Sequence, residues 1–167
     1  MPDSPLDRLN AEPAARAEEL LRSCNAAPSF APTVVAGRPY DSAEALVARA
    51  EEVSRALPWA EVSTALAGHA RIGDRMQGTS AEARASREEQ SGMTTAADSV
   101  RTAMLDGNRD YEERFGHVFL IRASGRSAEE MLAELHRRLG NDPETERAEA
   151  TEQLAQITGL RVAGLLA

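Results

Sequence analysis

The sequence has little from which a disulfide, a thiolate metal site or a membrane span could be built. Its one cysteine, Cys24, permits no intrachain disulfide, which is typical of a reducing compartment. No apolar run approaches the roughly 18 residues that cross a bilayer, and the first residues lack the basic-then-apolar order of a signal peptide. We therefore expect a cytoplasmic protein with no membrane segment.

Common metal-binding and catalytic motifs are missing too. The sequence has no His-x-x-x-His or Glu-x-x-His pair for a metal, no phosphate-binding or dinucleotide-binding glycine motif and no G-x-S-x-G nucleophile motif. The sequence thus gives no support for a metal or nucleotide cofactor.

Basic charge is scarce relative to acidic charge. Lys and Arg total 19 against 27 Asp and Glu, which gives a net charge of -8 at pH 7. Because nucleic-acid-binding proteins usually carry a basic patch, we expect neither a nucleic acid nor an anionic membrane as a partner. Hydrophobic residues make up 42% of the 167 residues, which is enough for a buried core and too many for a disordered chain.

The apolar spacing predicts an all-α protein with six or seven helices. Capping residues, glycines and prolines set the expected helix ends. The expected N-terminal caps are Asp41 or Ser42, Thr94 or Thr95, Ser127 and Asp142. We expect a bundle-like core made of helices over residues 10–21, 41–57, 59–68, 80–90, 94–116, 127–140 and 142–165.

Two regions are expected to be irregular. Four Pro and Gly residues between Cys24 and Tyr40 predict a loop, so residues 1–40 should be less regular than the rest. Residues 117–122, His-Val-Phe-Leu-Ile-Arg, predict a short extended segment with no partner strand. With no internal repeat and no low-complexity linker, residues 1–167 predict a single compact domain.

The expected helix over residues 80–90 carries no Leu, Ile, Val, Met or aromatic residue. Ser86, Glu89 and Gln90 stand at i, i+3 and i+4, so they share one face. They offer hydrogen-bond donors and acceptors to a small polar ligand. The alternative, favoured by this spacing alone, is an ordinary solvated helix face.

Arg161 places a cation on the apolar stripe of the last expected helix. Leu154, Ile157, Arg161 and Leu165 recur at i, i+3, i+7 and i+11. A guanidinium on a buried stripe needs an anion. That anion is either an internal Asp or Glu, which the pattern alone favours, or a ligand carboxylate held in a bidentate fork.

His69 follows the end of an expected helix and precedes a glycine-containing turn, where its side chain could project into a cleft. An imidazole titrates near neutral pH and exchanges a proton at cellular pH, although a histidine at a helix end more often interacts with exposed carbonyls. His117 and His136 are weaker candidates, because the first begins the extended run and the second adjoins two arginines on a helix facing solvent.

Several short motifs follow one another in a distinctive order. They are His69-Ala70-Arg71-Ile72-Gly73, Ser86-Arg87-Glu88-Glu89-Gln90, Asn108 to Tyr111, Phe115-Gly116, Phe119-Leu120-Ile121, Arg138-Leu139, Asn141, Glu146, Ile157 and Arg161. In this order and spacing the chain resembles the 2-oxo-4-hydroxy-4-carboxy-5-ureidoimidazoline (OHCU) decarboxylases. The resemblance covers most of the chain and is looser before Asp41.

The resemblance implies an all-α, cofactor-free homodimer, a carboxy-lyase that converts the small anionic substrate OHCU to (S)-allantoin in urate degradation. The family normally has a proline directly after its histidine, and Ala70 leaves that turn less constrained. By resemblance, His69 and Glu89 are catalytic, and the substrate contacts are Ala70, Ser86, Gln90, Ile121 through its backbone, and Arg161.

Two other functions fit the same residues. The chain could be a non-catalytic helical binding or scaffold module in which Arg161 pairs with Glu89. It could also keep the fold and act on another small ureido or imidazoline acid.

Overall fold

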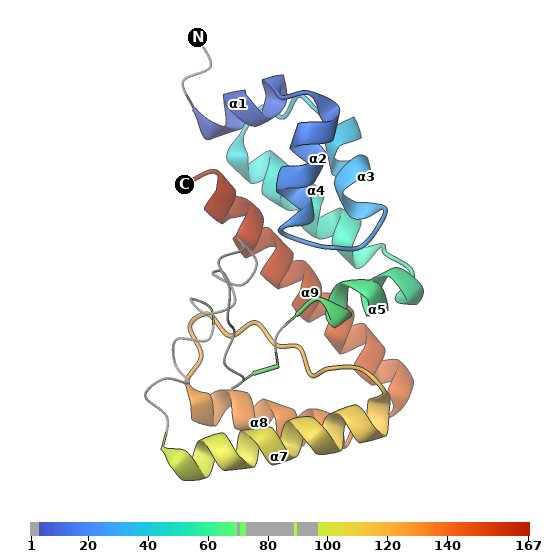
Figure 1. The fold of residues 1–167 in the computed structure, drawn as a ribbon, viewed down its shortest axis with the longest axis vertical. Coiled ribbons are helices and arrows are strands. Elements are labelled where there is room, and N and C mark those ends of the chain that lie inside the picture. The colour runs from blue at the N-terminus through green and yellow to red at the C-terminus, as the bar shows by residue number, and fades with distance from the viewer. Residues whose placement is uncertain (1–3, 70, 73–88, 90–96) are drawn as a thin grey trace. The chain divides into compact units, whose positions relative to one another are not determined.

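The computed structural model describes residues 4–69, 71–72, 89 and 97–167 (Figure 1). These residues form helices joined by turns and irregular segments, with no strand among them, which confirms the all-α class. None of the described helices is long and apolar enough to cross a membrane. The helices are α1 (Pro5–Ala11), α2 (Ala14–Arg22), α3 (Phe30–Ala36), α4 (Ala43–Arg55), α5 (Trp59–Ala67), α7 (Asp98–Phe115), α8 (Ala128–Leu139) and α9 (Pro143–Leu165).

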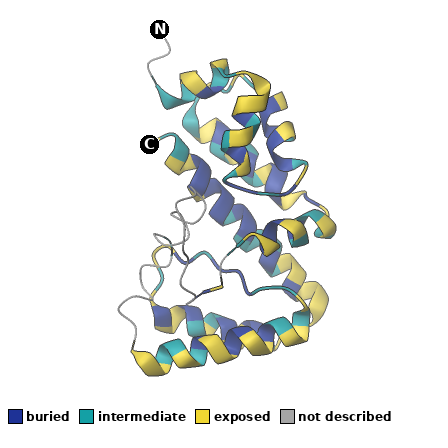
Figure 2. Cartoon of the chain, in the orientation of Figure 1, coloured by how far each residue is buried: buried dark blue, intermediate teal, exposed yellow. Residues whose placement is uncertain are grey.

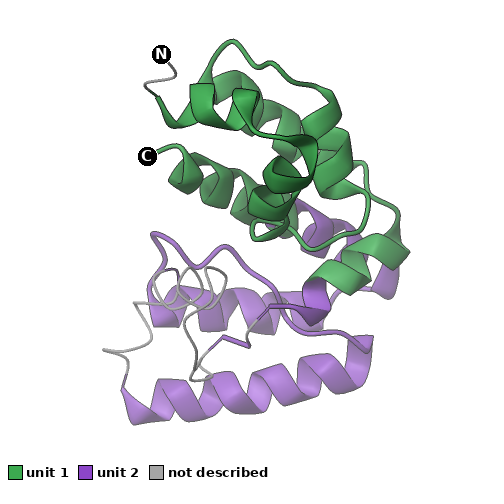
Figure 3. Ribbon diagram, turned by 45° about the horizontal axis from the view of Figure 1, so that its top comes forward, with its two compact units in different colours: residues 1–65, 154–167 green, residues 66–153 purple. Residues whose placement is uncertain are grey.

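The chain divides into two compact units (Figure 3). Unit 1 consists of residues 1–65 and 154–167, so it is built from both ends of the chain, and unit 2 consists of residues 66–153. Helices α5 and α9 each contribute residues to both units.

Side-chain caps begin several helices where the sequence predicts. The Ser42 hydroxyl accepts a hydrogen bond from the Ala45 N–H and starts α4, and the Ser127 hydroxyl accepts one from the Glu130 N–H and starts α8. Asp142 accepts from the Thr145 N–H at 2.9 Å at the start of α9. Each bond satisfies a backbone donor that the first turn of a helix leaves unpaired.

The expected loop between Cys24 and Tyr40 is wrong, because α3 forms inside it. Pro32 is the third residue of that helix, where the missing N–H would have had no partner within the helix. Phe30 and Val34 are fully buried and anchor the helix. Residues 5–36 therefore contain three helices instead of an irregular region.

The single helix expected over residues 10–21 is also wrong, because the structure divides this stretch between α1 and α2. Pro13 is the N-cap of α2, and Glu12 before it has extended backbone angles, φ -61° and ψ 146°. A proline disfavours the helical conformation in the preceding residue. The chain therefore leaves one helix and enters the next at Glu12.

Helix α7 begins later than predicted. Its N-cap is Ala97, which has an extended backbone and makes no side-chain cap, so the prediction of a cap at Thr94 or Thr95 is wrong. Its predicted end at Gly116 is confirmed, with φ at +79° in the left-handed region that glycine adopts readily. The helix expected over residues 80–90 lies outside the described residues, apart from Glu89, which is helical.

One face of α8 packs into the core of unit 2. Four buried residues recur along it, and a row of this spacing lies on one side of a helix (Figure 2). They are Ala128, Met131, Leu135 and Arg138. Three of them are apolar, and the fourth brings a guanidinium into the same core.

Candidate functional site

His69 lies two residues beyond α5 and is half-buried. Its backbone N–H donates to the Leu66 carbonyl at 3.0 Å, a bond that ends the helix in a tight turn. The main chain at His69 is thus held by the end of α5.

The residues just after position 70 are fastened to α7. The Arg71 guanidinium donates to both carboxylate oxygens of Glu112, with Nε–Oε1 at 2.5 Å and Nη2–Oε2 at 3.1 Å. Asn108 Nδ2 donates to the Ile72 carbonyl at 2.8 Å, and the Ile72 side chain is buried. Together with the turn at α5, these bonds fix the chain before and after His69.

Besides His69, four predicted site residues lie between positions 70 and 90. Glu89 is helical and half-buried. Ala70, Ser86 and Gln90 lie outside the described residues, so their roles stay predictions. Within the described ranges there is also no group of three or more His, Cys, Asp or Glu side chains placed to hold a metal.

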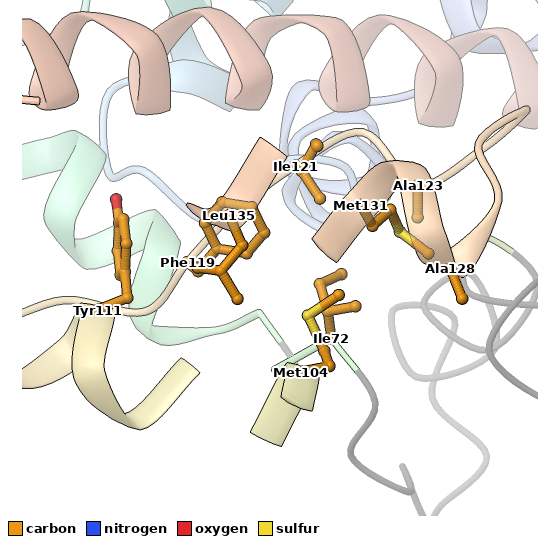
Figure 4. Close-up of a cluster of buried hydrophobic side chains, with 9 residues drawn as sticks. All are labelled: Ile72, Met104, Tyr111, Phe119, Ile121, Ala123, Ala128, Met131 and Leu135. Atoms are coloured by element: carbon orange, nitrogen blue, oxygen red, sulfur yellow. The ribbon is translucent and has the colours of Figure 1, made fainter. Parts of the chain in front are cut away.

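Ile121 lies in the predicted extended segment, which has neither helix nor strand over residues 118–123. Its side chain is 2% exposed. It belongs to a hydrophobic cluster contributed by α7, α8 and the segments around Ile72 and Ile121 (Figure 4). The cluster contains Ile72, Met104, Tyr111, Phe119, Ile121, Ala123, Ala128, Met131 and Leu135. Burial of these side chains holds the extended segment, which pairs with no strand among the described residues.

A buried ion pair lies beside this cluster. Arg138 and Glu146 are 1% and 0% exposed, and the guanidinium donates to Glu146 Oε1 through Nε at 2.8 Å and also through Nη2. The Tyr111 hydroxyl donates to the same carboxylate, and burial raises the pKa of that phenol. Asn141 Nδ2 donates to Glu146 Oε2 at 3.0 Å. The carboxylate is therefore neutralised and hydrogen-bonded, as a buried charge requires.

The same guanidinium reaches the extended segment. Arg138 Nη1 donates to the Leu120 carbonyl at 2.6 Å, and its central carbon lies 4.6 Å from the Phe119 ring centroid. Sequence reasoning named Arg138 and Glu146 only as motif positions and missed this role. Their separation of eight residues, with the Tyr111 hydroxyl arriving from another helix, gives no local pattern from which the pair could be read.

Arg161 belongs to unit 1, whereas His69, Glu89 and Ile121 belong to unit 2, so each is described within its own unit. Arg161 is 8% exposed on α9, as expected for a position on an apolar stripe. Its charge acts on the buried thiol of Cys24 and opposes the main effect, burial, which raises the pKa of that thiol to about 11. Cys24 is therefore a protonated thiol at neutral pH.

Two surface hollows in unit 1, of about 400 and 210 Å³, are lined by other residues than Arg161. The larger is bordered by Ala43, Glu44, Val47, Ala48, Glu51, Ala163 and Leu166, and the smaller by Ser29, Thr33, Arg49, Glu52, Val53, Ala56, Leu57 and Pro58. Neither contains a residue predicted for the site.

The other two histidines have structural surroundings. His117 packs edge-on against the Tyr111 ring, with centroids 5.4 Å apart, and burial lowers the pKa of its imidazole. His136 is exposed on α8, as predicted.

Solved structures show the class of protein to which this fold belongs. The crystal structure of OHCU decarboxylase in the presence of (S)-allantoin matches with a TM-score of 0.75 and 26% identity, over 89% of this chain and 97% of that chain. A crystal structure of (S)-allantoin synthase matches with a TM-score of 0.73, over 96% of this chain and 54% of that chain. Its identity of 16% shows a likeness of fold alone.

Sequence comparisons give the family. The OHCU decarboxylase family model matches residues 10–163. The 2-oxo-4-hydroxy-4-carboxy-5-ureidoimidazoline decarboxylase of Amia calva is 35% identical over 143 residues, which cover 83% of this chain and 81% of that protein. The uric acid degradation bifunctional protein TTL of Arabidopsis thaliana is 36% identical over 78 residues, which cover 47% of this chain and 24% of that protein. The chain belongs to the OHCU decarboxylase family.

Proposed function

We propose that this protein is a carboxy-lyase that decarboxylates OHCU to (S)-allantoin in urate degradation. The observation that carries the proposal is the family match over residues 10–163, which includes residues of both compact units. The matched range contains His69, Glu89, Ile121 and Arg161.

The proposed roles follow from the chemistry of each side chain. His69 exchanges a proton with the substrate hydroxyl, and Glu89 orients His69 or assists that transfer. Arg161 binds the substrate carboxylate, since a guanidinium and a carboxylate form a bidentate pair of hydrogen bonds. Ser86 and Gln90 supply further hydrogen bonds, Ile121 contributes its backbone, and Ala70 lines the turn after the histidine.

The reaction breaks one carbon–carbon bond. The carboxylate leaves as neutral carbon dioxide, and the electron pair of the broken bond is delocalised into the adjoining unsaturated system of the substrate. The adjoining carbon, which carries the ureido group, then accepts a proton on one face, and this sets the chirality of allantoin. The substrate hydroxyl gives up its own proton and becomes a carbonyl of allantoin. A closed pocket that removes water from the carboxylate favours its loss. Because the substrate holds the electron pair itself, the proposed mechanism uses no metal, pyridoxal or thiamine.

The proposal extends to the organisation of the protein. We propose that residues 1–167 act as one domain and that the protein works as a cytoplasmic homodimer. The family match across residues of both units supports the first statement. The resemblance to the family supports the second.

The direct test is a coupled assay in which a urate oxidase and a hydrolase generate OHCU from urate. We expect the protein to speed the appearance of dextrorotatory allantoin well above the spontaneous decay of OHCU. No acceleration would contradict the proposal and favour a non-catalytic helical module. Turnover of a related ureido or imidazoline acid, without turnover of OHCU, would change the substrate and keep the reaction class.

Arg161 gives a binding prediction that does not depend on turnover. We expect allantoin to raise the melting temperature of the protein, because a ligand that binds only the folded state stabilises it by about 2.7 kcal/mol at 100 times its Kd. Arg161→Ala should lose most of this stabilisation, measured by differential scanning fluorimetry. The control is Arg16→Ala, which removes an exposed arginine paired only at the surface with Glu19. Equal stabilisation of all three proteins would rule out Arg161 as a ligand contact.

A further inference from the structure

Each of the two peptide groups that flank Ile121 is held by a side chain from a different helix. The Leu120 carbonyl accepts a hydrogen bond from Arg138 Nη1 of α8 at 2.6 Å. The Arg122 N–H donates to Gln153 Oε1 of α9 at 2.9 Å. All of these residues belong to unit 2.

These two hydrogen bonds also determine where the N–H and the C=O of Ile121 point, because each shares a planar peptide group with one of the bonded atoms. A trans peptide is planar, with its C=O and N–H on opposite sides, and the one cis bond in the described residues is Arg38-Pro39. The Ile121 N–H therefore points away from Arg138, and the Ile121 carbonyl points away from Gln153. Neither group forms a hydrogen bond with another described residue, although the Ile121 side chain is buried.

A donor and an acceptor that pair with no described residue, on a fixed and buried segment, are suited to a ligand that brings the complementary groups. Buried backbone groups are nearly always hydrogen-bonded in proteins, so a partner is expected. OHCU carries both ureido N–H donors and carbonyl acceptors. A hydrogen bond weakens steeply when its angle falls below about 120°, so the directions of the Ile121 groups determine how well they bind.

We propose that Gln153 is a positioning residue that aims the Ile121 carbonyl at a ureido N–H of the substrate. This inference rests on the proposed function. Arg138 sets the direction of the Ile121 N–H in the same way, but it also neutralises the buried Glu146. Gln153 is the cleaner test, because the bond to the Arg122 N–H is its one side-chain hydrogen bond within the described ranges.

The expected kinetic effect is on substrate binding. Gln153→Leu keeps a side chain of similar volume but removes the oxygen that accepts from the Arg122 N–H. The peptide group between Ile121 and Arg122 is then free to rotate. We expect KM to rise about tenfold, with kcat changed by less than about threefold, because a contact made equally in the ground and transition states affects KM alone. Gln153→Glu keeps an oxygen that accepts from the Arg122 N–H, so its KM should stay within about threefold of the unaltered protein.

Thr151→Val provides the matched control on the same helix. The Thr151 hydroxyl donates to the Arg147 carbonyl within α9 at 2.8 Å, so its loss removes a side-chain hydrogen bond away from residues 120–122. We expect an unchanged KM for this variant. If Gln153→Leu does not fold, Gln153→Asn serves in its place, since the shorter side chain withdraws the acceptor and should raise KM equally.

The possible results separate the two proposals. An unaltered KM in the variants that lose the acceptor, or a KM for Gln153→Glu as high as theirs, would overturn the positioning role. Either result leaves the proposed function intact, because the unaltered protein still turns over OHCU. Absence of turnover by the unaltered protein contradicts the proposed function itself.

Discussion

Replacement of His69 by asparagine should lower the rate of OHCU decarboxylation by about 10²- to 10⁴-fold, the usual contribution of a positioned general acid or base. Asparagine keeps much of the size and polarity of the imidazole but has no group that titrates near neutral pH. His69→Ala should produce a similar loss. The measurement is the initial rate of allantoin formation from freshly generated OHCU, at low temperature and neutral pH.

The control for this prediction is His136→Asn, which makes the same change at an exposed histidine of α8. We expect it to keep the full rate. The far-ultraviolet circular dichroism of all three variants should match that of the unaltered protein, because His69 follows α5 and lies outside the hydrophobic cluster of unit 2. Activity that survives both substitutions of His69 would refute the proton-transfer role of His69. The protein would still be a decarboxylase, and another residue would transfer the proton.

Local sequence signals predicted much of the fold because they act over a few residues. Ser42 and Ser127 cap α4 and α8 as expected, since each hydroxyl reaches a backbone N–H three residues later. Gly116 ends α7 because a left-handed residue closes the helix. Such contacts are complete within one turn, so the sequence alone shows them.

The errors near the N-terminus have an equally local cause, which is the position of each proline within its helix. Pro32 stands in the first turn of α3, where proline is tolerated, although the Pro and Gly residues around it predict a loop. Pro13 stands just before α2 and ends the preceding helix, whereas the expected helix over residues 10–21 places it in a first turn. The same proline predicts either the start of a helix or a break in it, depending on which residue is assumed to begin the helix.

Parts of the candidate site depend on contacts that no local pattern shows. The apolar stripe of α9 predicted that Arg161 would be buried, and it is. The carbonyl of Leu120, by contrast, is 18 residues from the guanidinium that holds it, and the Tyr111 hydroxyl is 35 residues from Glu146. Only the tertiary fold brings such groups together. The meeting of His69, Glu89 and Arg161 around one substrate stays a prediction.

Replacement of Arg138 by methionine should reduce the free energy of unfolding by about 3–5 kcal/mol, because it leaves the Glu146 carboxylate buried without its cation. Glu146 is 0% exposed and would keep only the neutral donors Tyr111 and Asn141. The Leu120 carbonyl would also lose its donor. The measurement is urea unfolding at pH 7 followed by circular dichroism.

Arg137→Met supplies the matched control one residue away, because Arg137 is about half exposed and pairs with Glu134 and Glu149 at the surface. Surface pairs contribute roughly 0–1 kcal/mol, so we expect a small effect. Joining Arg138→Met with Glu146→Leu should recover part of the lost stability, since the stranded charge is removed as well. If Arg138→Met cost no more than Arg137→Met, the buried pair would not be what holds the segment from Phe119 to Arg122, and the geometry inferred for the Ile121 backbone would have to come from the hydrophobic cluster alone.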